Sequence, residues 1–224
     1  RDEAIMEGLP SDKLRVTGSP GLSALIDKRE LFARCPPTRP PSIINKSSGP
    51  IVIFVSESIN QIRPKMDEPN QFDHSRMSAN FDEYRVRNEL AHTLQAQFSS
   101  CTVLERLHPS ACVEAYSPIE LPGVSWKIDC DSDLHSLYWW ADAVVGMRSA
   151  GLLEAVLLGT PTVSYQPGLN DNNRCTAVRK GLISCCLSLG ELALWLDRNA
   201  GVSEKVFLSR PDYARENATE AVFS

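Results

Sequence analysis

The strongest restriction on the fold comes from an unbroken apolar run at residues 51–55, in which four of the five side chains are β-branched. A strand with one solvated face alternates apolar and polar residues, whereas a continuous run is typical of a strand covered on both faces. Strand-like segments separated by helical ones follow at residues 101–107, 124–128, 143–145 and 162–165. This alternation predicts a parallel sheet with helices on both faces, a Rossmann-like α/β fold.

Helices are predicted where large apolar residues recur at near-helical spacing, as they do most clearly over residues 81–98. Residues 59–80 are polar and contain two prolines, which predicts a long loop. The other predicted helices cover residues 22–33, 133–142, 150–158, 189–199 and, in the tail, 211–223.

The beginning of the chain differs in composition from the rest. Four of the seven residues at 35–41 are proline, which fixes φ and removes a backbone donor, so this segment is predicted to be a linker without regular structure. We therefore predict a hinge remnant and proline-rich linker at residues 1–49, and a Rossmann-like domain at 50–224. Because no methionine starts the chain, we expect it to be a piece of a longer protein.

Composition excludes several classes of protein. The net charge of -5 argues against a nucleic-acid binder, which would carry a basic face. The chain contains no secretory signal and no run of about 18 apolar residues, so no membrane span is expected. The seven cysteines and four histidines show no metal-ligand spacing, which favours reduced cysteines, a cytoplasmic location and no metal.

The segment that most resembles a binding site lies at residues 141–155. A buried strand is predicted to end before Gly146, and a helix to begin at Ser149, which is a typical N-cap residue. Free N–H groups and the positive end of the helix dipole suit a diphosphate there, and the turn through Met147 and Ala150 would contact it. Glu154, within two turns, would accept from a sugar hydroxyl. The alternative is that strand–glycine–helix turns of this kind serve packing alone.

Four further candidates follow predicted strands. Ser56 follows the first strand directly, although the neighbouring Glu57 is equally consistent with a turn residue that satisfies the backbone. Arg106 and His108 end another strand, where either would meet a phosphate or a base edge; alternatively, Arg106 points to the flank of the sheet and His108 caps a turn. Gln166 begins the loop after the strand at 162–165.

Residues 141–167 resemble the sugar-nucleotide signature of the GT-B glycosyltransferase superfamily. That signature is a small or glycine-rich turn, a glutamate and then Gly-x-Pro before the next strand, which here are Glu154, Gly159 and Pro161. The resemblance implies that Glu154 binds the ribose hydroxyls and that the turn at 146–150 binds the diphosphate.

Two more segments support this resemblance. Residues 7–20 are similar to the interdomain segment of these enzymes and of UDP-N-acetylglucosamine 2-epimerases, and residues 106–109 resemble an Arg-x-His-Pro pattern of the same domain. Together they imply the C-terminal half of a GT-B fold, separated from an N-terminal acceptor-binding domain. The expected substrate is a nucleoside-diphosphate sugar, UDP-linked, used without cofactor or metal. The isolated fragment is expected to be inactive, and no catalytic residue is assigned.

Two alternatives stay open. One is a 2-epimerase-like enzyme, although residues 148–151 read Arg-Ser-Ala-Gly where the epimerases usually carry Asp-Ser-Gly-Gly. The other is a non-catalytic binding module that retains the fold.

Overall fold

The computed structural model describes residues 8, 10, 19–44, 49–57, 82–109, 111–170, 173–202 and 205–209. The predicted loop at 59–80 and the predicted helix at 211–223 lie outside these residues. The contacts divide the chain into two units, residues 1–36 with 208–224, and residues 37–207. The predicted boundary between residues 49 and 50 stays a prediction.

In the first unit, the described residues form one helix, α2 (Pro20–Arg34). Ser19 caps it by accepting a hydrogen bond from the Leu22 N–H at 3.4 Å. The strands of the second unit are β1 (Ile51–Val55), β2 (Cys101–Arg106), β3 (Glu120–Leu121), β4 (Val124–Asp129), β5 (Ala143–Gly146), β6 (Thr162–Tyr165) and β7 (Ser184–Cys186). Its helices are α3 (Pro41–Ile44), α4 (Glu83–Gln97), the 3-10 helix η4 (Val113–Ala115), α5 (Leu134–Trp140), α6 (Ala150–Leu157), α7 (Thr176–Arg179) and α8 (Leu189–Asn199).

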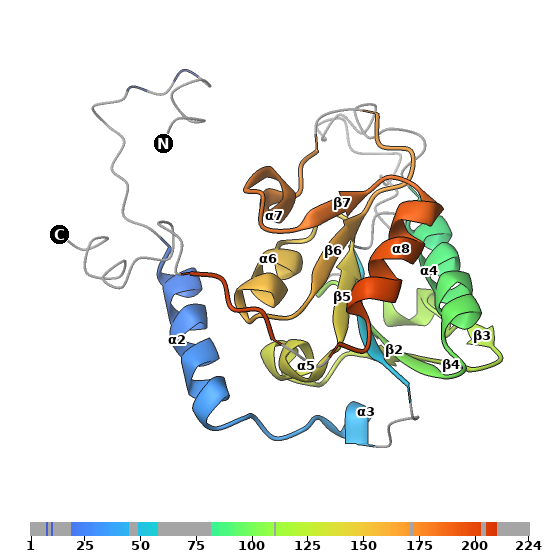
Figure 1. Ribbon diagram of the computed structural model, residues 1–224, viewed down its shortest axis with the longest axis horizontal. Coiled ribbons are helices and arrows are strands. Elements are labelled where there is room, and N and C mark those ends of the chain that lie inside the picture. The colour runs from blue at the N-terminus through green and yellow to red at the C-terminus, as the bar shows by residue number, and fades with distance from the viewer. Residues whose placement is uncertain are drawn as a thin grey trace. The chain divides into compact units, whose positions relative to one another are not determined.

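The seven strands form one sheet in the order β3-β4-β2-β1-β5-β6-β7. All neighbouring pairs are parallel except β3 with β4. Helices α4 and α8 cover one face, and α5 and α6 lie on the other (Figure 1). The predicted Rossmann-like α/β fold is therefore confirmed.

Strand β1 lies at the centre of this sheet, and all five of its residues are buried. Its side chains alternate between the two faces. Those of Val52 and Phe54 pack under α4 and α8, beside Leu90 and Leu192. This two-sided burial explains why the strand is apolar throughout rather than alternating.

Helix α8 shows how local sequence sets an element's limits. The hydroxyl of Ser188 accepts from the N–H of Glu191, whose carboxylate accepts in return from the N–H of Ser188, forming a capping box. Leu192 and Leu196, four residues apart, are both fully buried against the sheet. The helix spans the residues predicted for it.

Five short elements were not predicted: α3, which begins at Pro41 of the predicted linker, η4, β3, α7 and β7. The edge strand β3 has two residues and is the antiparallel member of the sheet. Strand β7 contains Ser184, Cys185 and Cys186, and α7 is a single turn. Elements this short contain too few residues to show a hydrophobic period, so only their contacts with neighbouring segments define them.

All seven cysteines lie in the described part of the chain, and none forms a disulfide. Among the described helices, none is both long and apolar enough to cross a membrane.

Lys205 connects the segment after α8 to the end of α5 through hydrogen bonds. Its ammonium group lies 3.3 Å from the Tyr138 carbonyl oxygen, 3.2 Å from that of Ala141 and 2.9 Å from the Thr160 hydroxyl. It also lies over the Trp139 ring at 5.6 Å. Burial lowers the pKa of Lys205 to about 8.

This pKa predicts a pH-dependent stability. Between about pH 8 and the ordinary lysine pKa of 10.5, the unfolded chain binds a proton at Lys205 that the folded chain does not. The free energy of unfolding should therefore rise across this range and lose that contribution as pH falls through 8. Urea unfolding of the wild type, compared with Lys205→Met from pH 7 to 10.5, measures it. The exposed Lys127→Met variant controls for removing one charge. A difference between the wild type and Lys205→Met that is constant with pH contradicts the prediction.

Candidate functional site

The carboxyl ends of β2, β1, β5 and β6 meet at one edge of the sheet, because these strands are parallel and adjacent. In doubly wound folds this edge is where ligands bind. Strand β5 ends at Gly146 and α6 begins at Ala150, so residues 147–149 form the connecting turn at the centre of this edge.

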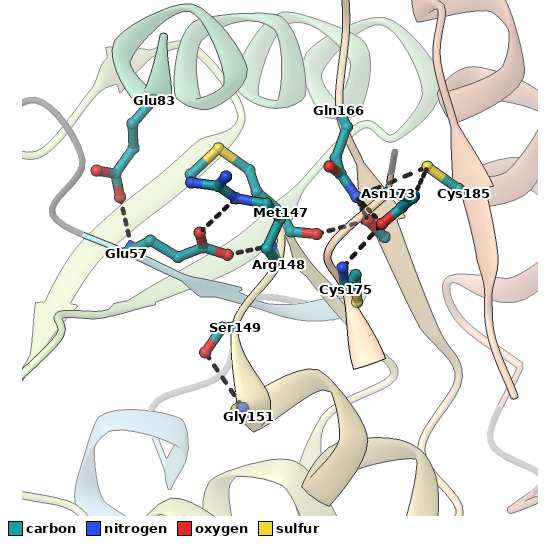
Figure 2. A network of polar contacts seen from close by, with 11 residues as sticks. Glu57, Glu83, Met147, Arg148, Ser149, Gly151, Gln166, Asn173, Cys175 and Cys185 are labelled. Carbon is teal, nitrogen blue, oxygen red and sulfur yellow. Dashed lines mark hydrogen bonds and ion pairs between the residues drawn. The ribbon is translucent and has the colours of Figure 1, made fainter. Parts of the chain in front are cut away.

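The turn is held by Glu57, which follows β1 (Figure 2). The backbone N–H of Arg148 donates to the Glu57 carboxylate, and the neighbouring Ser149 N–H also lowers the pKa of this group. The Arg148 side chain adds an ion pair, with 3.6 Å between its Nε and Glu57 Oε2. The backbone N–H of Glu57 donates in turn to Glu83 Oε1, at the start of α4, at 2.9 Å.

Two opposing influences act on Glu57. Burial raises the pKa of this carboxyl group and is the larger effect. The hydrogen bond from the Arg148 backbone, the Arg148 charge and the Ser149 hydrogen bond lower it, while nearby Glu83 raises it further. The carboxylate is thus confined to a small, mostly buried space by donors from the turn.

The other side of the same turn is fixed by β6. Gln166 Nε2 donates to the Ser164 hydroxyl at 2.7 Å, and that hydroxyl donates to the Met147 carbonyl at 2.5 Å (Figure 2). Gln166 Nε2 also reaches Asn173 Oδ1 at 3.1 Å, and Asn173 donates to the Cys185 sulfur at 3.2 Å. The amide oxygen of Gln166 is buried and has no hydrogen-bond partner among the described residues.

Helix α6 begins as predicted, with Ser149 as its N-cap. The Ser149 hydroxyl accepts from the N–H of Gly151 at 3.2 Å, and its carbonyl accepts from the N–H of Leu152 at 3.1 Å. The fully buried hydroxyl of Tyr138 points at this first turn, 2.6 Å from where a Cβ on Gly151 would lie. It has no hydrogen-bond partner in the described part of the chain.

Glu154 lies on α6, one turn beyond its start. Its side chain is 35% exposed, and its Oε2 lies 3.3 Å from Nε2 of His135 on α5. The carboxylate therefore has an intrachain partner but stays accessible to a ligand.

The remaining predicted residues are spread along the edge. Ser56 is buried, with its hydroxyl 3.3 Å from the Tyr116 hydroxyl. Arg106 ends β2 and bonds to Asp129 Oδ1 at 3.2 Å and to the Ser132 carbonyl at 3.1 Å. His108 is exposed, two residues beyond the end of β2.

The residues of the turn differ in their exposure. Met147 is fully buried, whereas Ala150, the first residue of α6, is exposed. Gly146 is buried, and a Cβ there would lie 3.0 Å from Leu152 Cδ2 and 3.2 Å from the Val55 carbonyl oxygen. Packing thus accounts for glycine at this position, and its contact with a ligand stays a prediction.

The contribution of Glu57 was missed, because the sequence supported a turn residue equally well. The position of Glu57, just after a predicted strand end, could have indicated a role in the site, but the prediction for this strand end was Ser56. Nothing in the sequence indicated that Tyr138 or His135 would lie beside α6.

The sheet order, the edge formed by the strand ends and the turn into α6 define a Rossmann-like α/β domain. No protein-family model and no curated protein sequence matches the chain. Several solved structures do match in fold. The UDP-GlcNAc 2-epimerase of Methanocaldococcus jannaschii, in complex with UDP-GlcNAc and UDP, is 10% identical with a TM-score of 0.63, and the match covers 99% of this chain and 57% of that one.

Two further UDP-GlcNAc 2-epimerases are similar. A putative enzyme from Listeria monocytogenes is 12% identical with a TM-score of 0.57, over 99% of this chain and 54% of its own. The enzyme from Neisseria meningitidis, bound to UDP-GlcNAc, is 13% identical with a TM-score of 0.54, over 99% and 57%. These likenesses confirm the predicted GT-B-like fold, and this chain spans 54–57% of the length of these proteins.

Proposed function

We propose that this chain is the nucleoside-diphosphate-sugar-binding half of a GT-B-fold enzyme, with a UDP-linked sugar as its ligand. The observation that carries the proposal is the placement of α6. This helix starts at the carboxyl end of a central parallel strand, with Ser149 as its N-cap and the accessible Glu154 carboxylate one turn further on. A helix start in this position suits a phosphate group, and a carboxylate beside it suits the hydroxyls of a ribose.

The other predicted residues are assigned roles in the same proposal. Arg106 or His108, with the turn at residues 146–150, would stabilise the leaving diphosphate in metal-independent glycosyl transfer. Ser56 and Gln166 would contact the ligand from neighbouring strand ends. A partner domain that binds the acceptor would supply the general base.

A 2-epimerase reaction on the same class of ligand is the second candidate. It is favoured by three matching structures with TM-scores above 0.5, two UDP-GlcNAc 2-epimerases and one putative one. Their names describe those proteins, and the turn Arg148–Gly151 of this chain lacks the Asp-Ser-Gly-Gly of the epimerases. UDP-GlcNAc supplied to the protein together with its acceptor-binding half separates the two: release of the epimerised sugar indicates the epimerase, and transfer to an acceptor indicates the transferase.

A third candidate is a non-catalytic module, favoured by the pairing of Glu57 with the amide and the side chain of Arg148. Calorimetric titration of the 224-residue chain with UDP, CDP and GDP tests this against the proposed function. We expect UDP to bind with a Kd below ~1 mM, which corresponds to about -4 kcal/mol. If none of the three nucleotides binds, the proposed function is contradicted and the non-catalytic module is favoured.

The Glu154→Gln variant tests the assigned ribose contact. Removing the charge from an acceptor of ribose hydroxyls should weaken UDP binding about tenfold or more, since a hydrogen bond to a charged group contributes about 1.5–3 kcal/mol. Inorganic pyrophosphate, which has no ribose, should bind the variant as it binds the wild type. Equal UDP affinity of variant and wild type, measured by calorimetry, contradicts the role of Glu154.

A further inference from the structure

The carboxylate of Glu57 holds the place where a phosphate of the proposed ligand would bind. The backbone N–H of Arg148, in the turn before α6, donates to this carboxylate. The Arg148 side chain is also paired with it, with 3.6 Å between Nε and Oε2. The Glu57 carboxylate therefore occupies the place before α6 in which an anionic ligand would bind.

An independent observation indicates that this position is suited to a ligand. The Tyr138 hydroxyl is fully buried and points at the first turn of α6, yet it has no hydrogen-bond partner among the described residues. Buried polar groups are usually satisfied, because leaving one without a partner is unfavourable. This hydroxyl would lie 2.6 Å from a Cβ on Gly151, and the Ser149 Oγ 3.4 Å from it.

The local charge opposes the entry of a further anion. Glu57 and Glu83 lie next to each other, joined by the bond from the Glu57 N–H to the Glu83 carboxylate, and Arg148 is paired with Glu57. These three side chains sum to one negative charge. A diphosphate that enters beside them must displace the Glu57 carboxylate to reach the amides, and then lies near two carboxylates.

We propose that Glu57 is an intramolecular competitor at this site, which competes with the phosphate groups of a ligand for the backbone amide and the side chain of Arg148. This rests on the proposed function, in which the ligand is a nucleoside diphosphate. Phosphate-containing ligands bind only when they displace Glu57, which lowers the affinity of each of them and leaves a bare diphosphate, without nucleoside contacts such as that of Glu154, only weakly bound. Removing the carboxylate removes this competition and increases affinity for a bare diphosphate.

The test compares sodium pyrophosphate and UDP on the wild type and on three variants, by calorimetry on the 224-residue chain. Glu57→Gln keeps the size of the side chain but removes its charge. Glu57→Ala removes the hydrogen-bond acceptor of the Arg148 amide altogether. Glu120→Gln, on the exposed edge strand β3, removes the same charge far from the turn in the sheet order and is the matched control. Circular dichroism confirms folding, and if Glu57→Ala does not fold, Glu57→Gln decides.

We expect both Glu57 variants to bind pyrophosphate at least about tenfold more tightly than the wild type. In these variants the ligand no longer has to break a hydrogen bond to a charged group, which accounts for a ratio of this size. Glu120→Gln should change it less than about twofold, as a screened surface charge does. If the Glu57 variants bind pyrophosphate no better than the wild type, or no protein binds it, the proposal is overturned.

The outcome also separates this proposal from the proposed function. Pyrophosphate binding that is equal in the wild type and the Glu57 variants, with UDP bound by all of them, overturns the role of Glu57 and leaves the proposed function standing. A tenfold gain for pyrophosphate with no UDP binding to any of the proteins supports the role of Glu57 and contradicts the proposed function.

Discussion

Replacing Arg87 by methionine is expected to lower the free energy of unfolding by about 3–5 kcal/mol. Arg87 and Glu105 form a buried ion pair, 2.7 Å between Nη2 and Oε2, with side chains 5% and 0% exposed. Trp126 donates to the same carboxylate oxygen at 2.8 Å, and Arg87 donates to the Ser117 carbonyl at 2.8 Å. Burial already raises the pKa of Glu105, and the variant would leave its charge without the arginine that compensates it.

The control lies two residues away on the same helix. Arg85 pairs with Glu89 at 2.8 Å, but the Arg85 side chain is 50% exposed, so Arg85→Met is expected to change the free energy of unfolding by about 0.5 kcal/mol or less. Urea unfolding of both variants at pH 7 measures the difference. If the two substitutions have the same effect, the buried pair does not contribute as the geometry requires.

A second variant distinguishes loss of the pair from loss of packing. Removing both charges, in Arg87→Met with Glu105→Leu, should recover much of the stability lost in Arg87→Met, because no buried charge is then left without a partner. A double variant no more stable than Arg87→Met alone indicates that the aliphatic and ring contacts of Arg87, which lies over the Tyr116 and Trp126 rings, account for the effect instead.

Gly151→Ala is expected to lower the free energy of unfolding by about 1–3 kcal/mol, although alanine is the better helix former. The added Cβ would lie 2.6 Å from the Tyr138 hydroxyl oxygen, and 3.4 Å from both Ser149 Oγ and Val55 Cγ1. Tyr138 is fully buried on α5, so its ring has no room to withdraw without displacing neighbours.

Removing the hydroxyl should relieve this conflict. In the Tyr138→Phe background, Gly151→Ala is expected to be neutral or to stabilise by up to about 1 kcal/mol, the difference in helix propensity. Gly190 occupies the same second position of α8 with no atom within 4 Å of its Cβ position, so Gly190→Ala is the matched control and should not destabilise. A destabilisation by Gly151→Ala that persists without the Tyr138 hydroxyl contradicts the prediction. Thermal unfolding of the four variants provides the comparison.

The elements that the sequence predicted well are those whose pattern is local. The strand at residues 51–55 is apolar along its whole length, and the helix at 189–199 carries its own capping box and buried leucines. The start of α6 at Ser149 was likewise predicted from a short side chain before an apolar helix.

The candidate site was predictable in position but only partly in composition. Ser149 and Glu154 belong to one local strand–turn–helix segment, and the parallel fold placed that segment at the edge where the strands end. Their intrachain partners, Glu57 and His135, were not predicted, because no sequence period connects them to the turn.

From the sequence alone, then, the α/β alternation, the central strand and the turn that begins α6 could be inferred, because burial on two faces and helix capping act between residues close along the chain. Tertiary structure alone decided that Glu57 reaches the amide of Arg148, 91 positions away, and that Tyr138 packs against Gly151. It also decided that the three residues of β7 complete the sheet. The physical reason is the same in each case: strand pairing, close packing and buried charge depend on which distant segments the folded sheet brings into contact.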